Sequence, residues 1–192
     1  LLAAGTGRRF GGDKLLALLP DGQPLALAAA HRLRQGLGPE SLLLAVLRPE
    51  QNELGRLLAG AGYRLVVSDD ARAGMGRTLA LGVAASPQAS GWLVALADMP
   101  RLRPATIARV ADALRGGASL AAPVYRGQRG HPVGFARPWR EALLALDGDM
   151  GARQVLTAAG AALLSIDSDD PGVVLDVDTP HDLAMLSADP TD

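Results

Sequence analysis

Short apolar runs alternate with segments of helical periodicity along most of the chain. The apolar runs predict strands at residues 1–3, 42–47, 64–67, 92–97, 119–123, 132–135, 162–166 and 173–175. The periodic segments predict helices at residues 24–35, 50–59, 77–85, 104–115, 138–146, 152–159 and 180–186. Several of these helices begin at a proline, which the first helical turn tolerates. Strands that alternate with helices are typical of βαβ units, so the pattern predicts an α/β fold with a mostly parallel sheet.

The chain is predicted to form one domain over residues 1–192, with a frayed tail at 187–192. Its 192 residues suit one α/β domain, and its content of 48% hydrophobic and 20% charged residues is unlike that of a disordered chain. No internal repeat, low-complexity linker or break in composition divides it. The sequence starts at Leu1 on an apolar segment and without a methionine, so we expect part of the first strand to precede it.

Composition excludes several classes of protein. The absence of cysteine excludes a disulfide framework, a thiolate metal site and a cysteine nucleophile. Aromatic residues make up only 3% and the formal net charge is −1, so a nucleic-acid partner is not expected. The longest uncharged run, between Arg77 and Asp98, is interrupted by Ser86-Pro87-Gln88 and cannot span a bilayer. We therefore expect a cytoplasmic protein without a membrane partner.

Charged residues are distributed unevenly in two ways. Of the 19 basic residues, Lys14 is the only lysine. Chance would explain this, but so would a need for a compact, mobile point charge, which the planar guanidinium of arginine does not supply. Residues 101–140 carry eight arginines and one acid, whereas residues 141–192 carry eleven acids and one arginine. The positive segment is either a set of solvated helix faces or a surface that faces a polyanionic small ligand.

Polar residues follow three of the predicted strands at the point where each strand ends. A glycine-rich loop that reaches Lys14 follows the first strand, Asp98 follows the strand at 92–97, and Asp176 and Asp178 follow the strand at 173–175. Ligands of open α/β sheets bind beyond the carboxyl ends of the strands. We therefore expect Asp98 and Asp178 to hold Mg²⁺, or Mn²⁺, at one edge of the sheet. Asp98 could instead only end a strand, Asp178 could only cap the following helix, and Asp176 is an open candidate.

The glycine-rich loop fits neither of the two common nucleotide-binding motifs. Phe10 stands where the dinucleotide fingerprint needs its third glycine, and no hydroxyl residue follows Lys14, as a P-loop requires. The glycines nevertheless leave backbone N–H groups free to line a phosphate site. Gly5 and Gly7, together with the cations Arg9 and Lys14, therefore predict the binding of a phosphate-bearing ligand.

Six ordered motifs extend this prediction over nearly the whole chain. They are Leu2-Ala3-Ala4-Gly5-x-Gly7-x-Arg9-Phe10-Gly11 with Lys14; Gly74-Met75-Gly76-Arg77-Thr78-Leu79 with Gly82; Ala97-Asp98-Met99-Pro100; Gly130-His131-Pro132-Val133; Gly148-Asp149-Met150-Gly151-Ala152-Arg153; and Asp176-Val177-Asp178-Thr179-Pro180. The set resembles the MobA-like nucleotidyltransferases, and most of all the cytidylyltransferases that act on the molybdenum cofactor. The resemblance implies a three-layer α/β/α sandwich with a Rossmann-like mixed sheet, and transfer of a nucleoside monophosphate from an NTP.

The same resemblance implies roles for individual residues. Arg9, Lys14 and Asp98 would be catalytic, with the two cations on the β- and γ-phosphates. The second substrate would contact His131, Asp149 and Arg153. The nucleotide-binding residues would be Leu2, Ala3, Ala4, Gly5, Gly7, Arg9, Lys14, Thr78 and Gly82.

Two residues favour a pyrimidine nucleotide. The resemblance implies that guanylyltransferases of molybdopterin usually carry glycine at the position of Ala4, whose methyl group could narrow the slot for the base. The hydroxyl of Thr78 could hydrogen-bond to the base. One methyl group in a pocket is worth roughly 1–3 kcal/mol, so Ala4 predicts a preference for CTP.

The implied reaction is an in-line attack by the terminal phosphate of molybdopterin-bound cofactor on the α-phosphorus of CTP, which releases pyrophosphate. The partners would be CTP, the cofactor, and client molybdoenzymes of the xanthine dehydrogenase type. Alternatives are guanylyl transfer to the same cofactor, nucleotidyl transfer to a sugar or alditol phosphate, and a module that binds a nucleotide without turnover. A redox enzyme is the least expected, since the third glycine of the dinucleotide fingerprint and all cysteines are missing.

Overall fold

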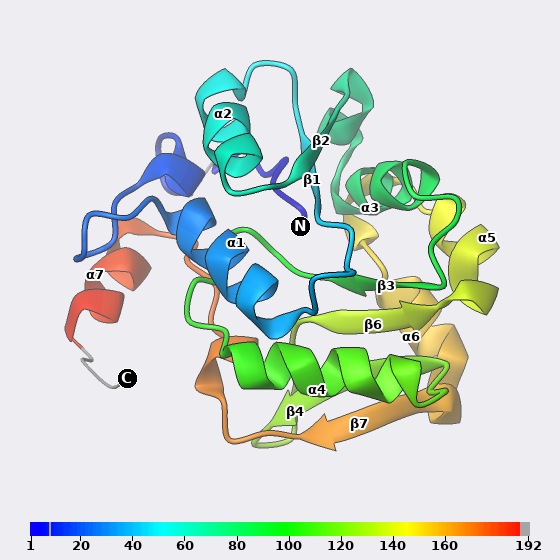
Figure 1. Ribbon diagram of the computed structural model, residues 1–192. Helices are drawn as coiled ribbons and strands as arrows, with labels where there is room; N and C mark the ends of the chain where they lie inside the picture. The colour runs from blue at the N-terminus through cyan, green and yellow to red at the C-terminus, as the bar shows by residue number, and fades with distance from the viewer. Residues whose placement is uncertain (8, 189–192) are drawn as a thin grey trace.

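A computed structural model of the protein describes residues 1–7 and 9–188. Figure 1 shows helices on both sides of a twisted sheet. The helices of the described part are α1 (Leu25–Gly36), α2 (Asn52–Gly60), α3 (Met75–Ala84), α4 (Pro104–Arg115), α5 (Arg140–Leu144), α6 (Arg153–Ala159) and α7 (Pro180–Ala188). The strands are β1 (Leu44–Leu47), β2 (Arg64–Val67), β3 (Gly91–Val94), β4 (Leu120–Tyr125), β5 (Gln128–Arg129), β6 (Val133–Ala136) and β7 (Leu163–Asp167). None of the described helices is long and apolar enough to cross a membrane.

The sheet is mixed. β1 and β2 pair in parallel, and a second sheet has the order β3-β6-β4-β5, with β7 parallel to β4. β6 runs antiparallel to both β3 and β4. Leu2 forms parallel bridges to Val46 and to Leu96, so the first residues join the two sheets. The predicted α/β class with a Rossmann-like mixed sheet is confirmed.

Two apolar clusters on opposite faces of the sheet make the fold three-layered. On one face α1, α2 and α4 pack through buried residues such as Leu33, Leu58 and Ile107. On the other face α3, α5 and α6 pack through residues such as Val83 and Leu143. In the sequence, the apolar residues of these helices recur at helical spacing and so form one face of each helix. In the structure, these apolar faces cover the sheet.

Most predicted elements form within a few residues of their expected ends, and the strand predicted at 173–175 is wrong. Residues 171–173 form a short 3₁₀ helix, because the carboxylate of Asp170 accepts a hydrogen bond from the Gly172 N–H at 2.8 Å and closes a tight turn. Val173 is fully buried in the core without a strand partner. α7 runs two residues beyond its predicted end, and residues 189–192 of the predicted tail lie outside the described residues.

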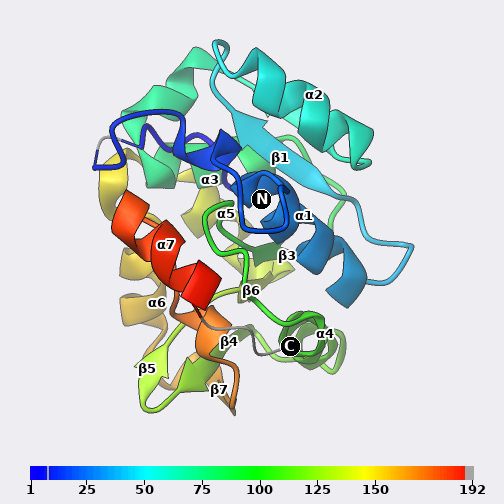
Figure 2. The ribbon, with the colours of Figure 1, turned by 90° about the vertical axis from the view of Figure 1, so that its left-hand side faces the viewer.

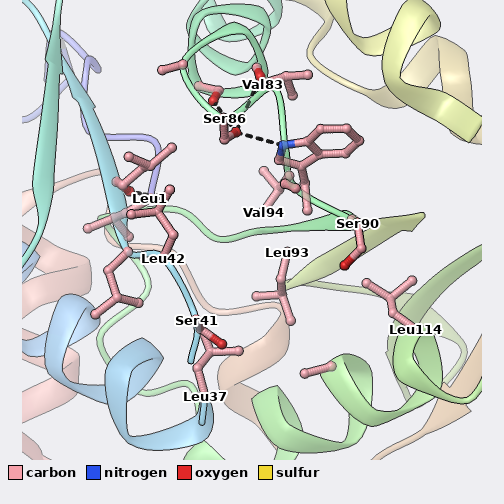
Figure 3. Close-up of a pocket in the computed structure, with 18 of the residues that line it drawn as sticks. Leu1, Leu37, Ser41, Leu42, Val83, Ser86, Ser90, Leu93, Val94 and Leu114 are labelled. Atoms are coloured by element: carbon pink, nitrogen blue, oxygen red, sulfur yellow. Dashed lines mark hydrogen bonds between the residues drawn. The ribbon is translucent and has the colours of Figure 1, made fainter. Parts of the chain in front are cut away.

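An apolar cavity of about 880 Å³ lies between the two sheets (Figure 3). Leu37, Leu42, Leu93, Val94 and Leu114 are among the side chains that line it. Trp92 and Ser86 also line it, and the indole N–H of Trp92 donates to Ser86 Oγ at 2.9 Å. The acidic residues singled out by the sequence do not line this cavity, so the candidate chemistry lies elsewhere.

Candidate active site

Lys14 lies between two of the predicted carboxylates. Its Nζ atom donates to Asp98 Oδ2 at 2.8 Å and to Asp178 Oδ1 at 3.1 Å, and its side chain is only 8% exposed. Burial alone would lower the pKa of Lys14, but the hydrogen bonds and charges of Asp98 and Asp178 outweigh burial and raise it. The single lysine of the chain is therefore a charged group at the centre of a cluster.

Asp98 reaches the cluster from the sheet, as expected. The parallel pairing of the first residues with the chain after β3 continues to Ala97, whose N–H donates to the Leu2 carbonyl at 3.1 Å. Asp98 follows at once, at the carboxyl edge. Its Oδ1 atom is buried and has no hydrogen-bond partner among the described residues. A buried carboxylate oxygen without a donor is an acceptor for a cation or a ligand.

Asp178 reaches the cluster from a loop, so the expectation that it follows a strand is wrong. A hydrogen bond of 3.0 Å from the Val177 N–H to the Asp98 carbonyl holds this loop beside the sheet edge. Asp178 does not cap the next helix either. Thr179 and Asp182 form a reciprocal capping box at the start of α7, with hydrogen bonds of 2.7 and 3.2 Å. The carboxylate of Asp178 is thereby left free to face Lys14.

Three carboxylates make this cluster a candidate for a divalent cation. Asp98, Asp176 and Asp178 each offer an oxygen, and these oxygens lie within 4.8 Å of one another. Burial, then the charges of Asp178 and Asp98, raise the pKa of Asp176, which is the response of an acid close to other acids. An all-oxygen ligand set suits hard cations such as Mg²⁺ and Mn²⁺. The donor set therefore fits the expected kind of metal.

The glycine-rich loop lies beside the cluster, and both ribbon views show it near α7 (Figures 1 and 2). Exposed Arg9 donates to Asp178 Oδ2 at 2.6 Å. Gly7 has a φ of 59°, a conformation that favours glycine, and its carbonyl accepts hydrogen bonds from Phe10 and Gly11. A dinucleotide fingerprint would open a helix directly after the loop, but α1 begins only at Leu25. The loop therefore lacks the geometry of a dinucleotide fingerprint, and its binding of phosphate remains a prediction.

His131 lies between β5 and β6, in the segment that links these two strands. Its N–H donates to the Val173 carbonyl at 2.8 Å. Burial lowers the pKa of His131, and the negative charge of Asp98 opposes this effect in part. His131 is thus within the electrostatic reach of Asp98, and its contact with the second substrate remains a prediction.

The segment at the start of α3 packs against the predicted second-substrate loop. A Cβ atom on Gly74 would come within 2.4 Å of an Asp149 oxygen, and one on Gly76 within 2.6 Å of a backbone carbonyl at residue 147. Only glycine allows this approach. Arg153 is the first residue of α6 and is exposed. The structure therefore brings Gly74 and Asp149 together, whereas Gly82 lies in the last turn of α3, against Val46.

The hydroxyl of Thr78 forms a hydrogen bond at the start of its own helix, α3. The side chain is 3% exposed, and its Oγ1 donates to the Gly74 carbonyl at 2.8 Å. The hydroxyl thereby holds the turn before α3, and its contact with a base remains a prediction.

Replacing Thr78 by valine is expected to lower the free energy of unfolding by about 1 kcal/mol, because the hydrogen bond of a buried hydroxyl to the Gly74 carbonyl is lost. Urea denaturation measures this. Thr157 on α6 makes the same type of bond to Arg153 at 2.9 Å but is exposed, so Thr157→Val should have almost no effect. Equal losses in the two variants would contradict a special role for the buried hydroxyl of Thr78.

The sequence analysis missed Gln51 and Arg48 beside the loop. Gln51 Nε2 donates to the Ala3 carbonyl at 2.9 Å, and Arg48 donates to the Gly5 carbonyl at 3.3 Å. Both residues lie just beyond the carboxyl end of β1. The rule that located Asp98 would have found them there.

These features define a class. A three-layer α/β fold with a glycine-rich loop, a buried lysine and clustered aspartates at one sheet edge is an arrangement for handling nucleotide phosphates. The family model for the MobA-like NTP transferase domain matches residues 1–164. The chain therefore belongs to the MobA-like NTP transferase family.

Relatives in this family carry different names. The chain is 35% identical to the nicotine blue oxidoreductase of Paenarthrobacter nicotinovorans, over 97% of this chain and 94% of that protein. It is also 35% identical to a probable molybdenum cofactor guanylyltransferase of Thermococcus gammatolerans, over 54% of this chain and 49% of that protein. These relatives agree with the family, but their names do not specify which nucleotide this chain uses.

Solved structures agree with the fold. A homologue of Rv0371c from Mycobacterium sp. strain JC1 superposes with a TM-score of 0.84 and 30% identity, covering 98% of this chain and 93% of that chain. Rv0371c from Mycobacterium tuberculosis, in complex with manganese, superposes with a TM-score of 0.76 and 28% identity, covering 97% and 95%. A divalent metal in that structure is in keeping with the carboxylate cluster of this chain.

Proposed function

We propose that this protein transfers CMP from CTP to the terminal phosphate of molybdopterin-bound molybdenum cofactor and releases pyrophosphate. The observation that carries the proposal is the convergence of Lys14, Asp98 and Asp178 within hydrogen-bond distance. In the reaction a cofactor phosphate oxygen bonds to the α-phosphorus of CTP, and the bond from that phosphorus to the oxygen bridging to the β-phosphate breaks. Such chemistry needs positioning and charge neutralisation rather than a protein nucleophile.

The residues of the cluster divide these tasks. Asp98 and Asp178 would hold Mg²⁺, with Asp176 as a third candidate, and a bound divalent ion would lower the repulsion between nucleophile and α-phosphate. Lys14 and Arg9 would neutralise the β- and γ-phosphates and the charge that develops on pyrophosphate. A phosphate monoester is largely ionised near pH 7, so the attack needs no general base.

The second substrate would lie between the cluster and the loop after α5. His131 would approach it from the side of Asp98, and Asp149 and Arg153 would approach it from the loop and from the start of α6. In support, Asp149 packs against Gly74, at the segment expected to bind the nucleotide. The two substrates would then meet across that contact.

The choice of CTP rests on Ala4. Its buried methyl group packs in a small apolar cluster with Val46 and Ala71, and Ala71 lies just before the segment that starts α3. Glycine in place of Ala4 would leave this wall one methyl group thinner. A thicker wall favours the smaller pyrimidine base.

Steady-state turnover with CTP and with GTP, each with molybdopterin-bound cofactor and Mg²⁺ or Mn²⁺, tests the proposal through release of pyrophosphate. We expect CTP to be preferred by about 10-fold or more in kcat/KM, and Ala4→Gly to reduce this preference. A preference for GTP in the wild-type protein would overturn the argument from Ala4 but retain nucleotidyl transfer. Turnover only with a sugar or alditol phosphate would replace the second substrate.

The relative named as an oxidoreductase makes redox chemistry a second candidate function. Two features speak against a bound dinucleotide: Phe10 stands in place of the third glycine, and only a short 3₁₀ helix, Lys14–Leu16, follows the loop before α1 begins at Leu25. An assay of NADH or NADPH oxidation coupled to reduction of a dye decides between redox chemistry and nucleotidyl transfer. Measurable dye reduction without nucleotidyl transfer would favour the redox candidate.

A further inference from the structure

The parallel ladder between the first residues and β1 is interrupted next to the candidate active site. Ala3 N–H donates to the Val46 carbonyl at 3.1 Å, and Val46 N–H donates to the Leu1 carbonyl at 3.0 Å. In a regular parallel ladder the next bond would join Arg48 N–H to the Ala3 carbonyl. This bond is replaced. The side-chain amide of Gln51 stands between the two groups: Oε1 accepts from Arg48 N–H at 2.8 Å, and Nε2 donates to the Ala3 carbonyl at 2.9 Å.

Arg48 likewise binds a backbone carbonyl of the loop through its side chain, two residues beyond Ala3. Its guanidinium donates to the Gly5 carbonyl at 3.3 Å and pairs with Glu50 at 2.9 Å. Glu50 is in turn held by Arg72 through two hydrogen bonds of 2.7 Å each. A hydrogen bond from its own backbone, and then the charges of Arg48 and Arg72, lower the pKa of Glu50. Arg48 is thus fixed from the side opposite to the loop.

Anchoring these carbonyls also orients the neighbouring amides. In a planar trans peptide the C=O and the following N–H point in opposite directions. Because the carbonyls of Ala3 and Gly5 point toward the residues after β1, the N–H groups of Ala4 and Thr6 point away from β1. The N–H groups of residues 4–7 donate no hydrogen bond to any other described residue. They are therefore available to oxygen atoms of a ligand.

We propose that Gln51 and Arg48 are positioning residues that hold the nucleotide-binding loop open. The Gln51 amide separates the first strand from β1 where a ladder bond would join them, and both side chains fix carbonyls so that the Ala4 and Thr6 amides face the nucleotide. The inference rests on the proposed binding of an NTP by this loop. It implies that Gln51 and Arg48, which belong to neither the glycine-rich motif nor the acidic cluster, contribute to the affinity for the nucleotide.

Gln51→Glu is the sharpest variant because the two side chains have nearly the same shape. It keeps an acceptor for Arg48 N–H but places an acceptor against the Ala3 carbonyl in place of a donor. We expect the Kd for CTP with Mg²⁺, measured by titration calorimetry without the second substrate, to rise about 10-fold, as for the loss of one hydrogen bond. The KM for CTP should rise similarly while kcat changes less. Gln154→Glu, at an exposed position of α6, is the matched control and should bind CTP like the wild type.

Arg48→Met and Arg48→Lys provide an independent pair if Gln51→Glu does not fold. Methionine should weaken CTP binding and lysine should restore part of it, whereas Arg56→Met, on an exposed position of α2, should have no effect. Folded Gln51→Glu and Arg48→Met variants that bind CTP within twofold of the wild type would overturn this inference alone. A wild-type protein that binds neither CTP nor GTP would instead contradict the proposed function on which the inference rests.

Discussion

Asp98→Asn is expected to reduce kcat by about 10²–10³-fold, which is the size of effect seen when one preorganised charge-stabilising group is removed. Asparagine keeps the shape of the side chain and an oxygen that can accept from Lys14 Nζ. It loses the negative charge and the second carboxylate oxygen, the buried Oδ1 that has no partner among the described residues. The loss should therefore fall on metal binding and turnover rather than on folding. Pyrophosphate release at saturating CTP, at several Mg²⁺ and Mn²⁺ concentrations, measures it.

Asp167→Asn is a suitable control for this experiment. Asp167 ends β7, is exposed, and does not belong to the carboxylate cluster. Its replacement changes the net charge of the protein by the same amount, so it should leave kcat unchanged. Thermal unfolding of both variants separates a lost reaction from a lost fold. An Asp98→Asn protein that is folded and retains wild-type turnover would refute the assignment of Asp98 as catalytic.

Lys14→Arg is expected to lower kcat by about 10²-fold although the positive charge is retained. The ammonium of Lys14 contacts Asp98 and Asp178 at the same time, in a site where its side chain is 8% exposed. A guanidinium is larger and planar, and it cannot occupy this position without moving one of the carboxylates. Initial rates and the KM for CTP of the variant measure the effect.

Arg9→Lys is the matched comparison, because Arg9 contacts the same Asp178 from outside at 76% side-chain exposure. Lysine keeps the positive charge for the β- and γ-phosphates, and the open surroundings of Arg9 allow the exchange without moving Asp178, so kcat should fall clearly less than in Lys14→Arg. Equal losses in the two variants would show that the burial of Lys14 carries no special role. Wild-type rates for Lys14→Arg would show that any cation suffices at this position.

The periodic pattern of the chain was sufficient to predict most of the fold. The helix at Pro104–Arg115 and the strand at Arg64–Val67 have the predicted ends, because each has a clear apolar pattern and clear boundaries. The strand predicted at 173–175 failed because an apolar run can be buried without strand partners. The hydrogen bond that Asp170 accepts from the Gly172 N–H closes a 3₁₀ helix at 171–173, which takes in the first residue of that run, and periodicity cannot detect such a competing turn.

For the candidate site, the residue types were predictable and their mutual contacts were not. The position of Asp98 after a strand and the rarity of Lys14 marked both residues in the sequence. Asp178 was predicted by its motif but for the wrong local reason, because a loop held by Val177 brings it to the cluster. Gln51 follows the carboxyl end of β1, which marks its position, but only the structure shows that its amide replaces a bond between two strands.

The sequence by itself determined the class of fold, the family and the residues that could carry phosphate chemistry, because side-chain periodicity and strand-end residues are local properties. Only the tertiary structure decided that one ammonium touches two aspartates from segments 80 residues apart, from Asp98 to Asp178. It also decided that Gln51 separates two strands and that Thr78 is occupied within its own helix. These are distances between segments remote in the chain, and they are set by the packing of both helical layers on the sheet.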